Sequence, residues 1–191
     1  MMKAVVIAGM SGLATAQVVT ANEYEPALRT YLESEIVNWA SSDVIISAIT
    51  AQNQVTSGYT QARVEAMDTA WRSELGGAET PTITPVVTGR AADFLREQVS
   101  ASGGRITEIF LMDARGLNVA ASDITSDYWQ GDEAKFSETF ARGGSALHFS
   151  EIELDESTQR YQAQISLTIT DPATGQPIGA MTVGIDADAL M

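Results

Sequence analysis

The 191-residue chain contains no cysteine. This absence excludes disulfide bonds, thiolate metal sites and thiol nucleophiles, so the fold must be stabilised by its hydrophobic core. Basic residues are also scarce, because 11 Lys and Arg stand against 25 Asp and Glu, for a formal net charge of -14. A surface of this sign repels phosphate groups, so nucleic acid and anionic membrane surfaces are poor partners and we expect no nucleic-acid binding.

Histidine occurs once, at His148, which excludes zinc sites built from several histidines. No G-x-S-x-G or H-E-x-x-H motif is present. The glycine pairs at 76–77, 103–104 and 143–144 follow expected helices, so we interpret them as helix ends and not as phosphate-binding loops. We therefore expect no enzymatic activity, no cofactor and no metal site. A hydrolase that depends on His148 is the enzymatic alternative.

Long apolar runs are missing after the N-terminus. Residues 1–21 contain one cation, Lys3, followed by apolar and small residues without an acid. This pattern is typical of a signal peptide, with Ala-Thr-Ala at 14–16 and Val-Thr-Ala at 19–21 as cleavage sites. We predict a periplasmic or secreted protein, with a buried N-terminal helix or an uncleaved anchor as alternatives. Lys135 is then the only lysine of the mature chain.

Residues 22–104 are predicted to form a helical region that packs on the rest of the chain. Apolar residues recur every three or four positions over 24–55, which predicts one helix roughly 45 Å long. A second helix is expected over 60–75. The third is expected over 84–99, with Thr84 as its N-cap and Pro85 at its first helical position.

Residues 105–191 change to alternating apolar and polar positions, with turn residues at regular intervals. The expected strands are 106–112, 117–121, 146–154, 160–170 and 177–185, and the first two are expected to form a hairpin across Asp-Ala-Arg-Gly at 113–116. Asp132 is expected to cap a short helix that ends near residue 142. The predicted fold class is α+β, a PAS-like five-stranded antiparallel sheet preceded by a long N-terminal helix and two further helices.

The strand at 160–170 has the clearest pattern. Its apolar positions, Tyr161, Ala163, Ile165, Leu167 and Ile169, alternate with Gln162, Gln164, Ser166, Thr168 and Thr170. One face should therefore belong to the core, while the other is polar and uncharged. Such a face suits contact with water, and it also suits the lining of a small polar pocket.

From about residue 26 to residue 190 the chain resembles the single Cache, or PDC-like, family of extracytoplasmic sensor domains. The resemblance depends on the order of four features: the long helix ending in Gln-Asn-Gln at 52–54, then FLMDARGLNVAAS, DYWQGDE and DPATGQPIGAMTVGID. It implies a small ligand bound on one side of the sheet, beneath the segment that joins the second and third strands. The segment Thr125 to Phe136 is in that position, so the resemblance implies a lid.

The sequence differs from typical members of the family in two ways. Members usually have flanking membrane spans and a cytoplasmic output module, whereas this sequence stops just after its last strand, so we expect a freestanding domain with a separate, membrane-bound signalling partner. Of the tyrosine, arginine, tryptophan and aspartate pattern of amino-acid-binding members, only Trp71-Arg72 is present, in reversed order. Recognition of an amino acid is therefore unsupported.

The predicted ligand-binding residues are Tyr128, Trp129, Asp127, Asp113, Arg72 and Ser122. Aromatic faces beside carboxylates attract cations, although one aromatic of the pair could instead fill the core. Arg72 could bind a ligand carboxylate with two parallel hydrogen bonds, or face solvent. Asp113 is alternatively a turn residue that bonds backbone N–H groups. Ser122 could instead join a hard-cation site with Asp123 and Asp127. The spacing of Ser122 and nearby aspartates does not match an EF-hand loop.

We predict an exported Cache-like sensor that binds a small polar metabolite and signals through another protein. Ligand binding would order the lid and change how the long helix is presented. The alternative is a ligand-free PAS-like scaffold in which the long helix forms a homodimer. Trp39 lies off the apolar stripe of that helix and could mark a subunit contact.

Overall fold

A computed structural model describes residues 22–191, and the predicted signal peptide lies outside the described residues. These residues form six strands, β1 (Ile106–Asp113), β2 (Asn118–Ala121), β3 (Leu147–Phe149), β4 (Glu153–Leu154), β5 (Tyr161–Thr170) and β6 (Pro177–Asp186). Five strands run in the order β2-β1-β6-β5-β3, and β4 pairs with β5 outside this path. Every pair is antiparallel. The predicted α+β, PAS-like fold is confirmed, with β4 as an additional short strand.

The hairpin between β1 and β2 is confirmed. Its turn closes through a hydrogen bond of 3.0 Å from the Gly116 amide to the Asp113 carbonyl. Gly116 has a φ of +77°, a left-handed conformation that side chains other than glycine rarely adopt. A glycine at this position therefore fixes where the chain reverses.

The expected strand over 146–154 is instead two short strands, β3 and β4. Ser150 ends β3 because its hydroxyl accepts the Gln164 amide at 2.7 Å, in place of a backbone carbonyl. The Ser150 amide still donates to the Gln164 carbonyl at 3.0 Å. A serine hydroxyl that competes for a backbone donor in this way interrupts the ladder.

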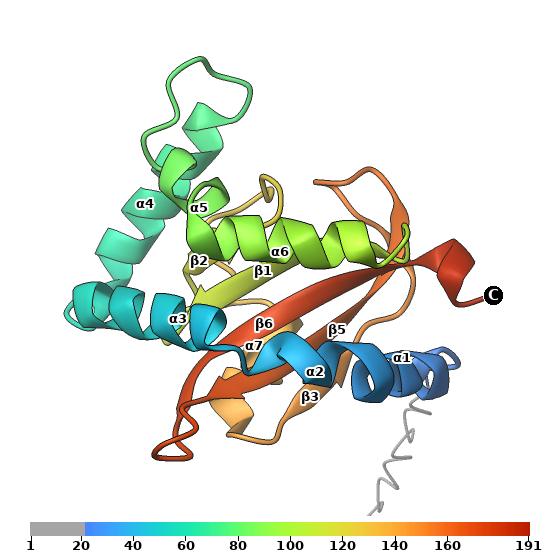
Figure 1. The fold of residues 1–191 in the computed structure, drawn as a ribbon. Coiled ribbons are helices and arrows are strands. Elements are labelled where there is room, and N and C mark those ends of the chain that lie inside the picture. The colour runs from blue at the N-terminus through green and yellow to red at the C-terminus, as the bar shows by residue number, and fades with distance from the viewer. Residues whose placement is uncertain (1–21) are drawn as a thin grey trace, which may run out of the picture.

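One face of the sheet is covered by helices α1 (Glu25–Tyr31), α2 (Val37–Ala40), α3 (Asp43–Thr56) and α6 (Arg90–Ala101), which lie in front of the strands in Figure 1. The core between them contains Leu28, Ile36, Ile45, Ile49, Leu95, Ile109, Leu111, Ile165, Val183 and Ile185. These four helices and the sheet thus share one hydrophobic core. Burial of this apolar surface is the main stabilising contribution to the fold.

The prediction of one straight helix over 24–55 is wrong. A π-helical turn, Leu32–Ile36, follows α1, and the chain leaves the helical conformation at Ser41 and Ser42 before α3 begins. Ser42 is extended, with φ -66° and ψ 149°. The bend keeps Ile36 and Ile45 on the sheet, and both are fully buried. The Ser-Ser-Asp sequence at 41–43 contains the residue types preferred at a helix N-cap. This local signal favours a new helix start, whereas the apolar periodicity over 24–55 favours one helix.

The helix expected over 84–99 is also divided. It consists of α5 (Thr84–Val87) and α6, separated by Thr88 and by Gly89, whose φ is +89°. Thr84 is the first residue of α5 and not its N-cap, which is Ile83. The helix expected over 60–75 is confirmed as α4 (Gln61–Glu74), which begins after the N-cap Thr60. In Figure 1, α4 stands beside the sheet and does not cover the face that α6 covers.

The opposite face of the sheet is apolar at one end and polar at the other. A second core, which includes Val64, Trp71, Ile83, Val86, Phe110, Met112, Tyr128 and Phe136, lies at the β1–β2 end. Along β5, Gln162 and Ser166 are buried on this face, and the Ser166 and Thr182 hydroxyls are 3.0 Å apart. Tyr161 was expected in the core, but it starts the strand and is 63% exposed.

Within residues 22–191, no helix combines the length and the apolar character that a membrane span requires.

Candidate ligand-binding site

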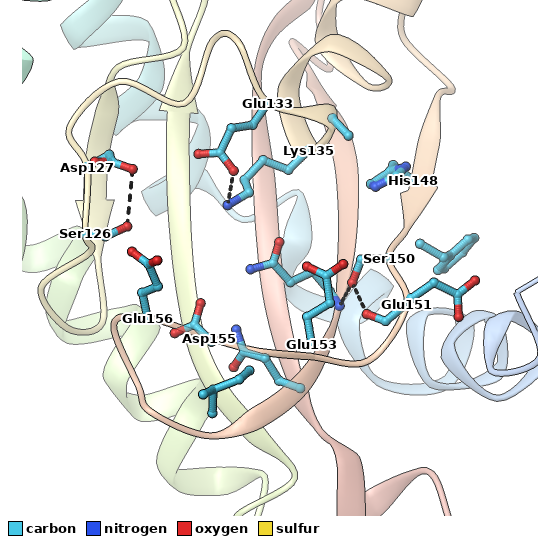
Figure 2. Close-up of a pocket in the computed structure, with 15 residues that line it drawn as sticks. Ser126, Asp127, Glu133, Lys135, His148, Ser150, Glu151, Glu153, Asp155 and Glu156 are labelled. Carbon is cyan, nitrogen blue, oxygen red and sulfur yellow. Dashed lines mark hydrogen bonds and ion pairs between the residues drawn. The ribbon is translucent and has the colours of Figure 1, made fainter.

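A cavity of about 610 Å³ lies over the polar end of this face (Figure 2). Three segments surround it: residues 126–135, including the start of α7 (Ala134–Ser137), residues 148–156 from β3 to β4, and β5. Gln162 and Gln164 of β5 contribute to its lining. The uncharged polar face predicted for residues 160–170 therefore lines a pocket, which was one of the two interpretations of its sequence pattern. The volume is within the usual range for small-molecule sites.

Acidic side chains dominate the lining, which includes Asp127, Glu133, Glu151, Glu153, Asp155 and Glu156. Lys135 is the one Lys or Arg in the lining, and its Nζ pairs with Glu133 at 2.9 Å. His148 adds no fixed positive charge, because burial lowers the pKa of its imidazole below the usual value. The cavity thus presents an excess of negative charge around a polar, uncharged sheet surface.

Lys135 is held over the sheet and does not extend into solvent. Its side chain is 16% exposed, and its Nζ lies 5.4 Å from the centre of the Phe110 ring. Figure 2 shows Lys135 reaching across from the α7 side beside Glu133. This geometry fixes the positive charge at one end of the cavity, while Glu153, Asp155 and Glu156 lie at the other end.

A network of polar side chains lies beneath the Asp155 end. Buried Glu108 of β1 accepts hydrogen bonds from Gln162 Nε2 at 2.7 Å and from the Ser157 hydroxyl at 3.2 Å. The same hydroxyl lies 2.6 Å from Asp155. Burial, followed by the nearby Asp155 charge, raises the pKa of Glu108 above its usual value. Since one hydroxyl proton cannot bond two carboxylates at once, a protonated Glu108 that donates to Ser157 satisfies all three groups.

Gln162 lies at the centre of this network because Gly184, on the neighbouring strand β6, has no side chain. A Cβ at Gly184 would lie 2.7 Å from Gln162 Oε1, so any other residue at this position would displace the Gln162 amide. Gln162 also accepts a hydrogen bond from Thr107, so both ends of its amide are engaged. The Gln164 side chain, by contrast, makes no hydrogen bond within the described part of the chain and can bond a ligand.

Of the six residues predicted to bind ligand, Asp127 lines this cavity. Its carboxylate pairs with Arg72, whose Nε is 3.0 Å away, and Arg72 also pairs with Asp68 at 2.9 Å. The structure therefore brings Arg72 and Asp127 together, with the guanidinium engaged by two carboxylates of the protein. Arg72 lies in a separate shallow groove that also contains Trp129.

The two aromatic residues of the predicted cage point away from the cavity. Tyr128 is 6% exposed and stacks on Trp71 in the second core, so the reading in which one aromatic fills the core holds for Tyr128. Burial, followed by the nearby Asp113 charge, raises the pKa of Tyr128 to about 12. Trp129 donates from Nε1 to the Arg115 carbonyl at 2.9 Å, against the hairpin turn.

Asp113 and Ser122 also lie outside the cavity lining. Asp113 is fully buried and accepts from Gln52, Thr56 and the amides of Arg115 and Leu117, all within 3.1 Å. The Ser122 hydroxyl accepts the Ile109 amide at 2.9 Å at the end of the β1–β2 pair. Both side chains therefore bond backbone groups, which is the alternative role expected for Asp113 but was not anticipated for Ser122.

The helix cap predicted at Asp132 is wrong. The N-cap of α7 is Glu133, which makes no side-chain capping bond, and Asp132 is exposed. The α-helix ends at Ser137, and a 3-10 turn over Phe140–Arg142 follows it. A capping residue does not locate the start of a one-turn helix well, because few helical residues follow it to show where the helix begins.

Several residues of the cavity were missed by sequence reasoning, among them Lys135, His148, Glu153 and Asp155. The alternation of β5 pointed to Gln164, whereas Lys135 in α7, His148 in β3 and Glu153 in β4 lie in elements of two to four residues, which are too short to show a periodicity. Their convergence depends on the crossing of the 126–135 segment over the sheet, and no local pattern encodes that crossing.

Ser150, which lies near His148 in the lining, donates its hydroxyl to the Glu151 carbonyl at 2.8 Å and accepts the Gln164 amide. Across residues 22–191, no group of three or more histidine, aspartate or glutamate side chains is arranged to hold a metal ion.

The sequence matches no protein-family model and no curated protein sequence. Among solved structures, the sensor domain of the V. cholerae histidine kinase DctB has a TM-score of 0.49 and 13% identity, over 88% of this chain and 54% of that chain. The ligand-binding domain of the Campylobacter jejuni chemoreceptor Tlp3, in complex with L-norvaline, has a TM-score of 0.45 and 13% identity, over 93% and 65%.

A third neighbour is the ligand-binding domain of the Pseudomonas fluorescens chemoreceptor CtaA in complex with L-alanine, with a TM-score of 0.41, 15% identity and coverage of 76% and 57%. The chain thus spans less than two thirds of each neighbour. All three are sensor or ligand-binding domains of kinases and chemoreceptors, the class that the sequence resembles. At these values the similarity assigns no ligand, partner or residue role to this chain.

Proposed function

We propose that this protein is an exported sensor-type domain that binds a small, positively charged polar metabolite and communicates with a separate signalling protein. The observation that carries the proposal is the cavity of about 610 Å³, with six carboxylates in its lining against one lysine. An amine or guanidinium group would be attracted to Glu153 and Asp155, while the Gln164 amide would bond its polar body. A ligand carboxylate would be repelled at the same end.

Each element of the cavity has a distinct role in this proposal. The 126–135 segment and the 150–156 segment are the two walls, and β5 is the floor. Lys135 neutralises Glu133, so the net attraction is concentrated at the opposite end. Of the residues predicted from sequence, Asp127 would meet the ligand directly, whereas Tyr128 and Trp129 would hold the wall in place.

The test is a thermal-shift and calorimetric screen of the purified protein against putrescine, choline, arginine and succinate. A ligand at 100 times its dissociation constant stabilises the protein by about 2.7 kcal/mol. For a protein of this size that corresponds to a rise of roughly 5 to 10 °C in melting temperature. We expect rises with the cations and none with succinate.

The matched pair of variants is Glu153→Gln, in the cavity lining, and Glu97→Gln, an exposed residue of α6 outside it. Both remove one negative charge, so a general electrostatic effect would weaken cation binding equally in the two. Weaker binding in Glu153→Gln alone supports the cavity. Silence of the wild-type protein across the screen would contradict the proposal and favour the ligand-free scaffold.

A further inference from the structure

Helix α4 is joined to the wall of the cavity by the side chains of three of its residues. Asp68 accepts the amides of Tyr128 and Trp129, both at 3.0 Å. Trp71 donates from Nε1 to the Thr125 carbonyl at 2.9 Å. Arg72 completes the link through its ion pair with Asp127. All of these bonds converge on residues 125–129, so the position of α4 depends on the position of this segment.

Asp127 belongs to the cavity and to this link at the same time. One of its oxygens lies 3.0 Å from Arg72 Nε, and the residue also lines the cavity. Its side chain is 26% exposed, so an entering ligand can reach it. A cation bound at Asp127 would compete with Arg72 for the same carboxylate.

Arg72 has other carboxylates within its own surroundings. It keeps Asp68, which pairs with its Nη2 at 2.9 Å. The groove in which it lies is also lined by Glu65 of α4 and by Asp132. The guanidinium therefore has an alternative arrangement, in which it remains neutralised on α4 while Asp127 is free for a ligand. Two such arrangements of one side chain are what a coupling between two sites requires.

We infer that α4 reports the occupancy of the cavity, with Asp127 as the carboxylate that either Arg72 or a bound cation holds. The inference rests on the proposed function for the ligand, but the link itself is a property of the protein alone. Binding of a cation would loosen α4 from residues 125–129 and change the surface that α4 presents. Thermodynamic reciprocity then requires that loosening Arg72 from Asp127 strengthens cation binding.

The first experiment needs no ligand and measures hydrogen exchange of the α4 amides. In Asp127→Asn we expect residues 61–74 to exchange about two- to fivefold faster than in the wild-type protein, in line with the loss of one partly exposed ion pair. The α6 amides, which have no contact with Asp127 in the network described, are the internal reference. Unchanged exchange in α4 would overturn the coupling whatever ligand binds.

The second experiment measures the affinity for putrescine in Arg72→Gln and in a control variant, Arg63→Gln. Both variants remove one positive charge from α4, but Arg63 lies by the Tyr59 ring, away from Asp127. We expect Arg72→Gln to bind putrescine at least about threefold more tightly than Arg63→Gln does. Equal affinities would show a general charge effect and overturn the inference.

The two proposals fail in distinguishable ways. Faster α4 exchange in Asp127→Asn, together with no binding of any cation by the wild-type protein, would overturn the proposed function and the ligand half of this inference. Cation binding with unaltered α4 exchange would overturn the inference and leave the proposed function standing.

Discussion

The indole of Trp71 stacks on the phenol ring of Tyr128, with centroids 5.3 Å apart and planes inclined by 12°. This contact joins α4 to the segment that forms a wall of the candidate ligand site. It lies in the second core, where Trp71 is fully buried. Trp71 thus stabilises the fold and also positions the wall of the candidate site, and these two effects can be measured separately.

Replacement of Trp71 by alanine should lower the free energy of unfolding by about 3 to 5 kcal/mol, because it leaves a large cavity and an unpaired Thr125 carbonyl. Urea denaturation measures this loss. Trp39→Ala is the comparison, since Trp39 is only partly buried and meets Phe94 edge to face. A loss in Trp71→Ala no larger than in Trp39→Ala would contradict the role of the stack.

Glu108 should make stability depend on pH with a sign opposite to that of most carboxylates. Its pKa is raised in the folded protein above the ordinary 4.5, so folding favours its protonated form. No cost arises well below pH 4.5, where both states are protonated; the cost grows as pH rises from 4.5 towards the raised pKa and is complete above it. Glu108→Gln, which imitates the protonated acid, should therefore gain stability over the wild-type protein as pH rises above 4.5.

Thermal unfolding across pH 4 to 8 tests this prediction, with Glu138→Gln as the reference of opposite sign. Hydrogen bonds from Arg142 lower the pKa of Glu138, so its contribution is present at neutral pH and is lost as pH falls. The two variants should diverge from the wild-type protein in opposite directions at pH 7. A Glu108→Gln variant that is less stable than the wild-type protein at pH 7 would show that the buried carboxylate is ionised and favourable.

Asp113, which the sequence placed at a turn, should contribute more to stability than Asp132, which the sequence placed at a helix cap. Replacement of Asp113 by alanine removes the carboxylate that accepts from buried Thr56, from partly buried Gln52 and from two turn amides, and should cost about 3 kcal/mol or more. Asp132→Ala should stay within about 0.5 kcal/mol, because Asp132 is exposed and caps no helix. Chemical denaturation of the two variants provides the measurement, and a costly Asp132→Ala would restore the predicted cap.

The sequence determined the elements whose information is local. The alternation over 160–170 predicted β5 and its polar face, and the Asp-Ala-Arg-Gly turn predicted the first hairpin. Thr60 and the following apolar stripe located α4. Composition predicted a core-stabilised fold without disulfides and with a strongly negative surface. For the strand, the hairpin and α4, residues within a few positions of one another carry the signal. They either form the hydrogen bonds of a turn or cap, or they place apolar residues at a regular spacing.

Tertiary structure decided where helices bend and which side chains converge. The bend at Ser42 keeps both Ile36 and Ile45 against the sheet. The spacing of apolar residues alone fits a straight helix equally well. Asp127 and Arg72 are 55 positions apart and meet only because α4 packs on the 125–129 segment. The cavity likewise joins residues from three segments. Such contacts depend on packing between elements, so the polar residue types could be read from the sequence but their partners could not.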